Sequence, residues 1–218
     1  MFKRLLTTCS LAIAFMLGST TAVATVIYDN FGPGDSFNTL SGYVIADGST
    51  PGFNFFAEDT GFVTSIDFGM AIFGVGVDDP QTINFSLFTH ADGNIGTLLE
   101  AFSVTVSHPA GDPATSTGDL TGTTLLSSGQ QYWLVGSSPG GVGVRWLWNN
   151  QGDTGVQRAT DGTLFQFRTL PTFRVNADSV SVAEPGALVL LVSGLAALAA
   201  LRRRHRCAPT RGRSAVTH

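Results

Sequence analysis

The charges of this chain divide it into three parts. All sixteen aspartates and glutamates lie between Asp29 and Glu184, where only four arginines oppose them, so this middle region has a net charge of −12 and no lysine. The other eight basic residues lie near the two ends, beside two long apolar runs. Basic residues next to an apolar segment stay in the cytoplasm, so this separation predicts membrane topology. The acidic middle region excludes a basic nucleic-acid-binding protein.

Residues 1–24 have the three parts of a secretory signal. Two basic residues precede the apolar run LAIAFML, and the small residues Ala22 and Ala24 follow it. A signal peptidase needs small residues at these two positions, so we predict cleavage between Ala24 and Thr25. A buried N-terminal helix is the alternative, but no amphipathic face accompanies the apolar run.

A second apolar segment, residues 186–201, is followed by four arginines, Arg202, Arg203, Arg204 and Arg206. As a helix it would be ~24 Å long, shorter than the ~30 Å hydrocarbon core of a bilayer. We predict a marginal transmembrane helix whose arginines act as a membrane stop, with the basic tail 202–218 in the cytoplasm. A core helix is the alternative, but a core helix would not end in a basic cluster.

The tripeptide Ala183-Glu184-Pro185 precedes this apolar segment. Proline disfavours helix in the residue before it, so the chain up to Glu184 should stay extended, as a protease requires. With the apolar helix and the arginine cluster, residues 181–206 resemble the PEP-CTERM sorting signal of Gram-negative bacteria, although Ala183 replaces the first proline. The resemblance implies cleavage by an exosortase, a membrane protease with a catalytic cysteine.

The two cuts would leave a chain of about residues 25–184. Both cysteines, Cys9 and Cys207, lie outside it, so in an oxidising compartment this region relies on its core alone. Its length suits one domain.

Short runs of β-branched and aromatic residues recur through this region, separated by glycine, proline, aspartate and asparagine. We predict ten strands, at residues 26–31, 42–46, 53–57, 63–73, 82–89, 98–107, 131–135, 142–148, 163–168 and 172–175. This pattern predicts an all-β fold, an antiparallel, jelly-roll-like β-sandwich over residues 25–178. Residues 179–185 would be a linker with the sorting motif, and a signal helix and a transmembrane helix would flank the sandwich.

Several segments of this region resemble the choice-of-anchor R domain. They are residues 31–39 (FGPGDSFNT), Gly42-Tyr43, residues 87–100 with its DGNIGTLL run, and residues 131–134 (QYWL). The family often has proline where this chain has Ile95. Its members are joined to alternative surface anchors and have no established activity, so the resemblance implies an extracellular domain and no catalytic residues.

Asp78, Asp79 and Asp92 are the candidate metal ligands, because carboxylate oxygens bind calcium. They lack the alternating acidic spacing of a dedicated calcium loop, and aspartate beside glycine, proline or asparagine is an ordinary turn former. The turn interpretation is therefore favoured, and no cofactor is expected beyond this calcium alternative.

Trp146, Trp148 and Asn149 are the candidate ligand-binding residues. Side chains repeat every two residues along a strand, so both tryptophans share one face. Facing outward they would stack on sugar rings, with Asn149 as a hydrogen-bonding group. Facing inward they would be core, and this interpretation is favoured because Val142 and Val144 share their face.

The region has two histidines, His90 and His108, and neither belongs to a recognisable catalytic motif. We therefore predict a protein that is not an enzyme: an exported surface or extracellular-matrix protein, held briefly in the inner membrane. Its partners would be signal peptidase, an exosortase-type protease and an exopolysaccharide, with no nucleic acid. The alternative is a carbohydrate-binding module that uses the tryptophan pair, with or without calcium.

Overall fold

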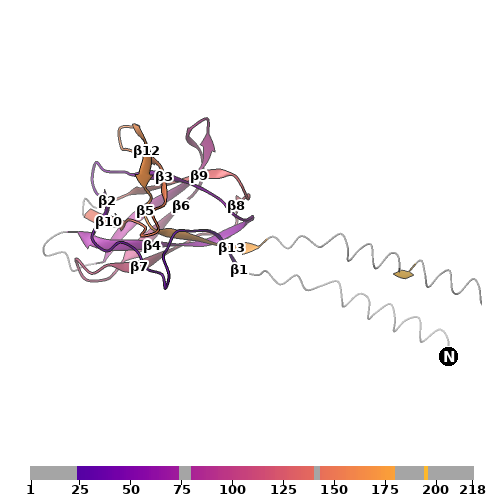
Figure 1. Ribbon diagram of the computed structural model, residues 1–218, viewed down its shortest axis with the longest axis horizontal. Coiled ribbons are helices and arrows are strands. Elements are labelled where there is room, and N and C mark those ends of the chain that lie inside the picture. Colours follow the sequence, from indigo (N-terminus) through magenta and orange to yellow (C-terminus); the bar gives the residue numbers. More distant parts are fainter. Residues whose placement is uncertain (1–23, 74–79, 140–142, 180–193, 196–218) are drawn as a thin grey trace, which may run out of the picture. The chain divides into compact units, whose positions relative to one another are not determined.

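The computed structural model describes residues 24–73, 80–139, 143–179 and 194–195 (Figure 1). The first three ranges form thirteen strands, and all their pairings are antiparallel. The strands are β1 (Ala24–Asp29), β2 (Gly42–Ile45), β3 (Gly52–Phe56), β4 (Gly61–Phe73), β5 (Gln81–Ala91), β6 (Asn94–Val106), β7 (Ala114–Asp119), β8 (Leu125–Leu126), β9 (Gln131–Ser137), β10 (Gly143–Leu147), β11 (Thr154–Arg158), β12 (Leu164–Thr169) and β13 (Phe173–Ser179).

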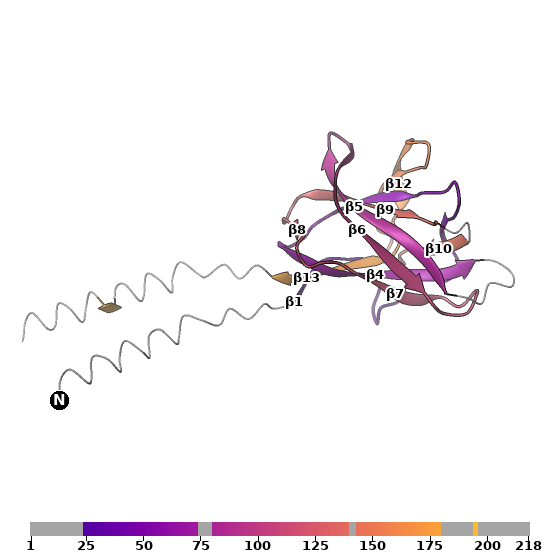
Figure 2. The ribbon, with the colours of Figure 1, turned by 180° about the vertical axis from the view of Figure 1, so that it is seen from behind.

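The strands form two sheets. One sheet has seven strands in the order β1-β13-β4-β10-β2, with β7 and β8 also paired to β4, and the other has six in the order β12-β11-β3-β9-β5-β6. The hairpins β5–β6 and β11–β12 project from the same side of the molecule (Figures 1 and 2). The predicted all-β, antiparallel fold is confirmed, and each of the ten predicted runs overlaps one observed strand.

Aromatic side chains hold the two sheets together. Phe68 of β4 stacks on Phe85 of β5 with ring centroids 4.2 Å apart, and Trp146 of β10 meets Phe53 of β3 edge-on at 5.4 Å. All four side chains are fully buried. In each pair one ring comes from each sheet, so the two sheets pack face to face as in a sandwich.

The first and last strands of this domain are neighbours. β1 pairs with β13, and Ala24 at the start of β1 lies opposite Asp178 near the end of β13. Both ribbon views show β1 and β13 side by side (Figures 1 and 2). The chain therefore enters and leaves the domain at the same end of one sheet.

Most of the predicted targeting residues lie outside the described residues. These are Ala22 with the rest of residues 1–23, the sorting motif of Ala183, Glu184 and Pro185, and the membrane stop of Arg202, Arg203, Arg204 and Arg206. Of the predicted membrane span, only Gly194 and Leu195 are described. In the part of the chain that the structure describes, no helix has the length and apolar character needed to cross a membrane.

Candidate functional site

The proposed tryptophan surface does not exist, because Trp146 is fully buried. β10 lies between β4 and β2, and Trp146 points from it toward the other sheet, with its Nε1 donating to the carbonyl of Thr172 at 3.0 Å. Trp148 is half-buried beside Tyr43, with ring centroids 5.8 Å apart. The hypothesis of an outward-facing pair is therefore wrong, and the core interpretation is confirmed for Trp146.

Asn149 is buried, and its side chain is used within a turn. Its Oδ1 accepts hydrogen bonds from the backbone N–H groups of Gln151, Gly152 and Asp153 at 2.9–3.0 Å. Its Nδ2 donates to the carbonyls of Asp153 and Leu170 at 2.9 and 2.7 Å. These five bonds occupy its polar atoms, so in this structure Asn149 holds the turn, and its role in ligand binding stays a prediction.

Of the candidate metal ligands, only Asp92 lies within the described residues. It is exposed in the turn between β5 and β6 with a φ of 46°, a left-handed conformation that aspartate tolerates in turns. Where the structure describes the chain, no group of three or more histidine, cysteine, aspartate or glutamate side chains could hold a metal ion. The turn interpretation accounts for Asp92.

His90 supports the same hairpin. Its Nδ1 accepts a hydrogen bond from Nε1 of Trp133 at 3.0 Å, and its ring lies parallel to the indole. Trp133 is fully buried, so this pair fastens the end of the hairpin to β9.

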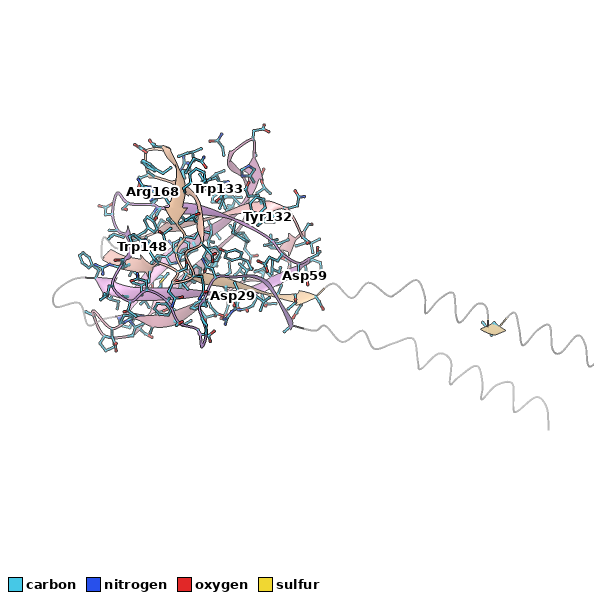
Figure 3. All side chains as sticks on the ribbon, viewed as in Figure 1. Asp29, Asp59, Tyr132, Trp133, Trp148 and Arg168 are labelled. Atoms are coloured by element: carbon cyan, nitrogen blue, oxygen red, sulfur yellow. The ribbon has the colours of Figure 1, made fainter. Side chains whose placement is uncertain are left out.

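A cleft of about 560 Å³ opens where β11 separates from β3. β11 pairs with β3 over only two residues, Gln157 and Arg158. At the next position the N–H of Val156 donates to the side-chain Oδ1 of Asn54 at 2.9 Å, in place of a backbone ladder bond. The two strands therefore splay apart, and the cleft occupies the gap. Figure 3 labels Asp29, a lining residue on β1, and Arg168 on β12, the strand that contributes Gln166 and Phe167 to the lining.

Aromatic rings and carboxylates line the cleft together. Phe56 at the end of β3 and Phe167 of β12 form its rim and are 59 % and 83 % exposed. Tyr28 of β1 is half-buried against Phe55, with ring centroids 5.2 Å apart. The carboxylates of the lining are Asp29, Glu58 and Asp153, and its side-chain amides are Asn54, Gln131 and Gln166.

Phe167 lies in a β-bulge of β12. Gly155 of β11 pairs with Arg168 and Gln157 with Phe165, so two residues of β12 lie opposite the single residue between them on β11. Phe167 is one of the two and has a φ of 56°. A bulky side chain at positive φ is strained, by about 1–3 kcal/mol, and such strain is concentrated at functional sites.

Only one of the three cleft carboxylates is neutralised. Arg174 donates from Nε to Asp29 at 2.8 Å and from Nη2 to Asp35 at 2.6 Å. Glu58 and Asp153 form no ion pair with any described residue. The cleft therefore keeps two uncompensated negative charges.

Burial and the negative charges of the cleft raise the pKa of the Tyr28 phenol. Burial raises the pKa of its phenol, and the carboxylates of Asp153 and Glu58 raise it further because they disfavour a second negative charge nearby. Burial also raises the pKa of Tyr43. Tyr28 therefore stays protonated in the folded protein well above the usual range for tyrosine.

The free energy of unfolding should fall as pH rises above about 10, the pKa of an unfolded tyrosine. There the unfolded chain loses the Tyr28 proton while the folded chain keeps it, so the unfolded state binds fewer protons and alkali favours it. No lysine titrates in the domain at these pH values. We expect Tyr28→Phe to flatten the decline, measured by urea unfolding between pH 8 and 11. An unchanged slope in the variant would contradict the shift.

Sequence reasoning did not single out this cleft. The run Phe165-Gln166-Phe167 could have indicated it. Two phenylalanines at alternate positions of a predicted strand form an apolar face, and such a face either packs against another element or binds a ligand. The bulge and the splaying of β11 from β3 depend on tertiary pairing and leave no comparable pattern in the sequence.

No protein-family model matches this chain, and a search of curated proteins finds no similar sequence. The resemblances to the sorting signal and to the choice-of-anchor domain therefore rest on the residues quoted above.

Proposed function

We propose that this chain is an exported, non-enzymatic surface or extracellular-matrix protein of a Gram-negative bacterium. Its signal segment delivers it across the inner membrane, its C-terminal helix holds it there for a time, and an exosortase-type protease cuts it near Glu184. The observation that carries the proposal is the charge separation, an acidic, cysteine-free middle region between two apolar segments with basic flanks.

The ends of the domain suit this processing. Ala24 and Asp178 lie opposite each other, so both flanking segments leave from one end of the sheet. Thr25 is the second residue of β1, and Glu184 follows the end of β13 at Ser179 by a few residues. Cuts at these two positions would remove both flanks and leave the β-sheet core whole.

The finer fold class is part of the proposal. A jelly-roll-like arrangement over residues 25–178 is supported by the way the chain alternates between the sheets. β2, β4 and β10 lie in the seven-stranded sheet, while β3, β5, β9 and β11 lie in the six-stranded one. The signal helix and the transmembrane helix complete the proposed architecture.

Expression of the full chain in a Gram-negative host with an exosortase-type protease tests the proposal. Intact-mass analysis should find a protein that begins at Thr25 and lacks the basic tail. Glu184→Ala should leave the tail attached and the protein in the membrane fraction, because the motif loses its only acidic residue. Asp178→Ala removes a nearby carboxylate outside the motif and should be processed normally.

Two results would overturn the proposal. One is recovery of the uncut 22.9 kDa chain from the cytosol. The other is the same mature C-terminus in Glu184→Ala as in the unaltered protein, which would show that the cut does not depend on the motif.

A further inference from the structure

We propose that the cleft between β3, β11 and β12 binds a glycan without acidic groups, with a pyranose ring stacked on Phe167. This inference is independent of the route by which the protein is exported. The site differs from the tryptophan surface: it is lined mainly by strands of the six-stranded sheet, together with β1 of the other sheet.

The rim of the cleft offers the apolar contact that a sugar ring needs. Phe167 is 83 % exposed and Phe56 is 59 % exposed, and the two approach the opening from different strands. The face of an aromatic ring carries negative charge density, which attracts the polarised C–H groups of a pyranose. Exposed rings beside a polar recess are therefore suited to a ligand with one apolar face and many hydroxyls.

The walls supply both kinds of hydrogen-bonding group. Glu58 and Asp153 accept from hydroxyls, and the amides of Gln131 and Gln166 can donate or accept. Such planar groups can each bind two neighbouring hydroxyls of one sugar ring.

The backbone of β3 adds further groups. Gly136 donates to the carbonyl of Pro51 and Ala57 to that of Gln130, which fixes the ladder between β3 and β9. The alternation of an antiparallel ladder then directs the N–H and C=O groups of Asn54 and Phe56 away from β9, toward the cleft. An open stretch of strand thus faces the same space as the side-chain groups.

Charge selects among glycans. No arginine, lysine or histidine belongs to the described residues that line the cleft, and the carboxylates of Glu58 and Asp153 have no ion-pair partner among the described residues. A uronic acid, a sulfated sugar or a phosphorylated sugar would be repelled there. Neutral hexoses and amino sugars would not, and a free sugar amine would gain an ion pair.

The strain at Phe167 is explained by such a role. If the side chain served only stability, a residue suited to positive φ would serve better at this exposed position. The bulge instead aims a large ring at the mouth of the cleft. We therefore expect Phe167→Asn to raise the midpoint of urea unfolding while it removes the stacking surface.

Isothermal titration calorimetry tests the proposal on the full chain, purified in a detergent without a sugar head group. The probes are hexamers of β-1,4-glucose, α-1,4-glucose, β-1,4-N-acetylglucosamine and deacetylated β-1,4-glucosamine, with a galacturonate hexamer as the acidic comparison. We expect binding to at least one of the first four and none to galacturonate.

Matched variants locate the binding. Phe167→Asn should weaken it at least tenfold, equivalent to about 1.4 kcal/mol. Phe62→Ala removes a partly exposed phenylalanine of β4, outside the cleft, and should leave affinity unchanged. Glu58→Gln should weaken binding of the deacetylated hexamer more than that of the neutral ones, because only the former carries amines.

Any of three results would overturn the proposal. The first is that none of the four non-acidic hexamers binds. The second is that the galacturonate hexamer binds more tightly than each of those four, and the third is that Phe167→Asn leaves the affinity unchanged. Because unfolding is measured on the same samples, a loss of binding in Phe167→Asn with an unchanged or raised midpoint cannot be attributed to misfolding.

Discussion

Replacing Trp146 with alanine is expected to lower the free energy of unfolding by about 3–5 kcal/mol. The indole is fully buried between the sheets. Its ring centroid lies 5.1–5.8 Å from those of four phenylalanines, Phe53, Phe68, Phe85 and Phe173. The neighbouring rings are anchored in four different strands and cannot collapse into the space. For a domain of this size, the loss corresponds to a fall of about 10 °C in the melting temperature.

Near-ultraviolet circular dichroism during urea unfolding measures this effect. Trp146→Phe keeps an aromatic ring in the core but loses some of the indole's contacts and the bond from Nε1 to the carbonyl of Thr172, so it should cost less than half as much. Phe62→Ala, at a partly exposed site, should cost under about 1 kcal/mol. If Trp146→Ala unfolds at the same urea concentration as Phe62→Ala, the indole is not the centre of the core.

The ten predicted strands could be recognised because each is rich in β-branched and aromatic residues and is bounded by turn-forming residues, and some also alternate apolar and polar residues. In β5 the side chains of Ile83, Phe85 and Leu87 are buried and those between them are not, as the alternation indicates. The same rule identified the inward face of β10 at Val144 and Trp146. Local pattern sufficed where a strand contributes large side chains to the core.

The three strands that were not predicted, β7, β8 and β11, lack such a pattern. β7 has the sequence ATSTGD, and at Gly118 an added Cβ would lie 2.7 Å from the ring of Phe102, so glycine is required by a neighbour distant in the sequence. β8 has only two residues. β11 is ordered by β12 and by the side chain of Asn54. In these strands long-range contacts override weak local propensity.

The same limit explains why the cleft was missed and the tryptophans were singled out. The sequence shows which residues share a face of a strand, but it identifies the buried face only where several apolar residues share it, as in β10, and not in a strand such as β12. Trp146 and Phe167 are both aromatic residues in strands, and one is fully buried while the other is 83 % exposed. The difference in burial follows from the position of β10 inside its sheet, between β4 and β2, and of β12 at the edge of the other sheet.

Asn149→Ala is expected to lower the free energy of unfolding by about 3 kcal/mol, because each of its five hydrogen bonds contributes about 0.5–1.5 kcal/mol and the solvent can replace some of them. The substitution would leave the turn at residues 150–153 without its acceptor. It would also remove one of the two donors to the carbonyl of Leu170, which keeps only its bond from the backbone N–H of residue 149. Asn149→Asp keeps the acceptor but sets a negative charge against two carbonyls, so it should be at least as damaging.

The effect of Asn149→Ala on glycan binding shows whether Asn149 also shapes the cleft or only stabilises the fold. Asp153 and Leu170, the residues that Asn149 holds, both line the cleft, so Asn149→Ala should also weaken glycan binding under conditions where the chain is still folded. Asn150→Ala is the control, since Asn150 is exposed and its Nδ2 bonds only to Ser36. Its unfolding midpoint should change little. Equal midpoints for Asn149→Ala and Asn150→Ala would show that the turn does not depend on the buried amide.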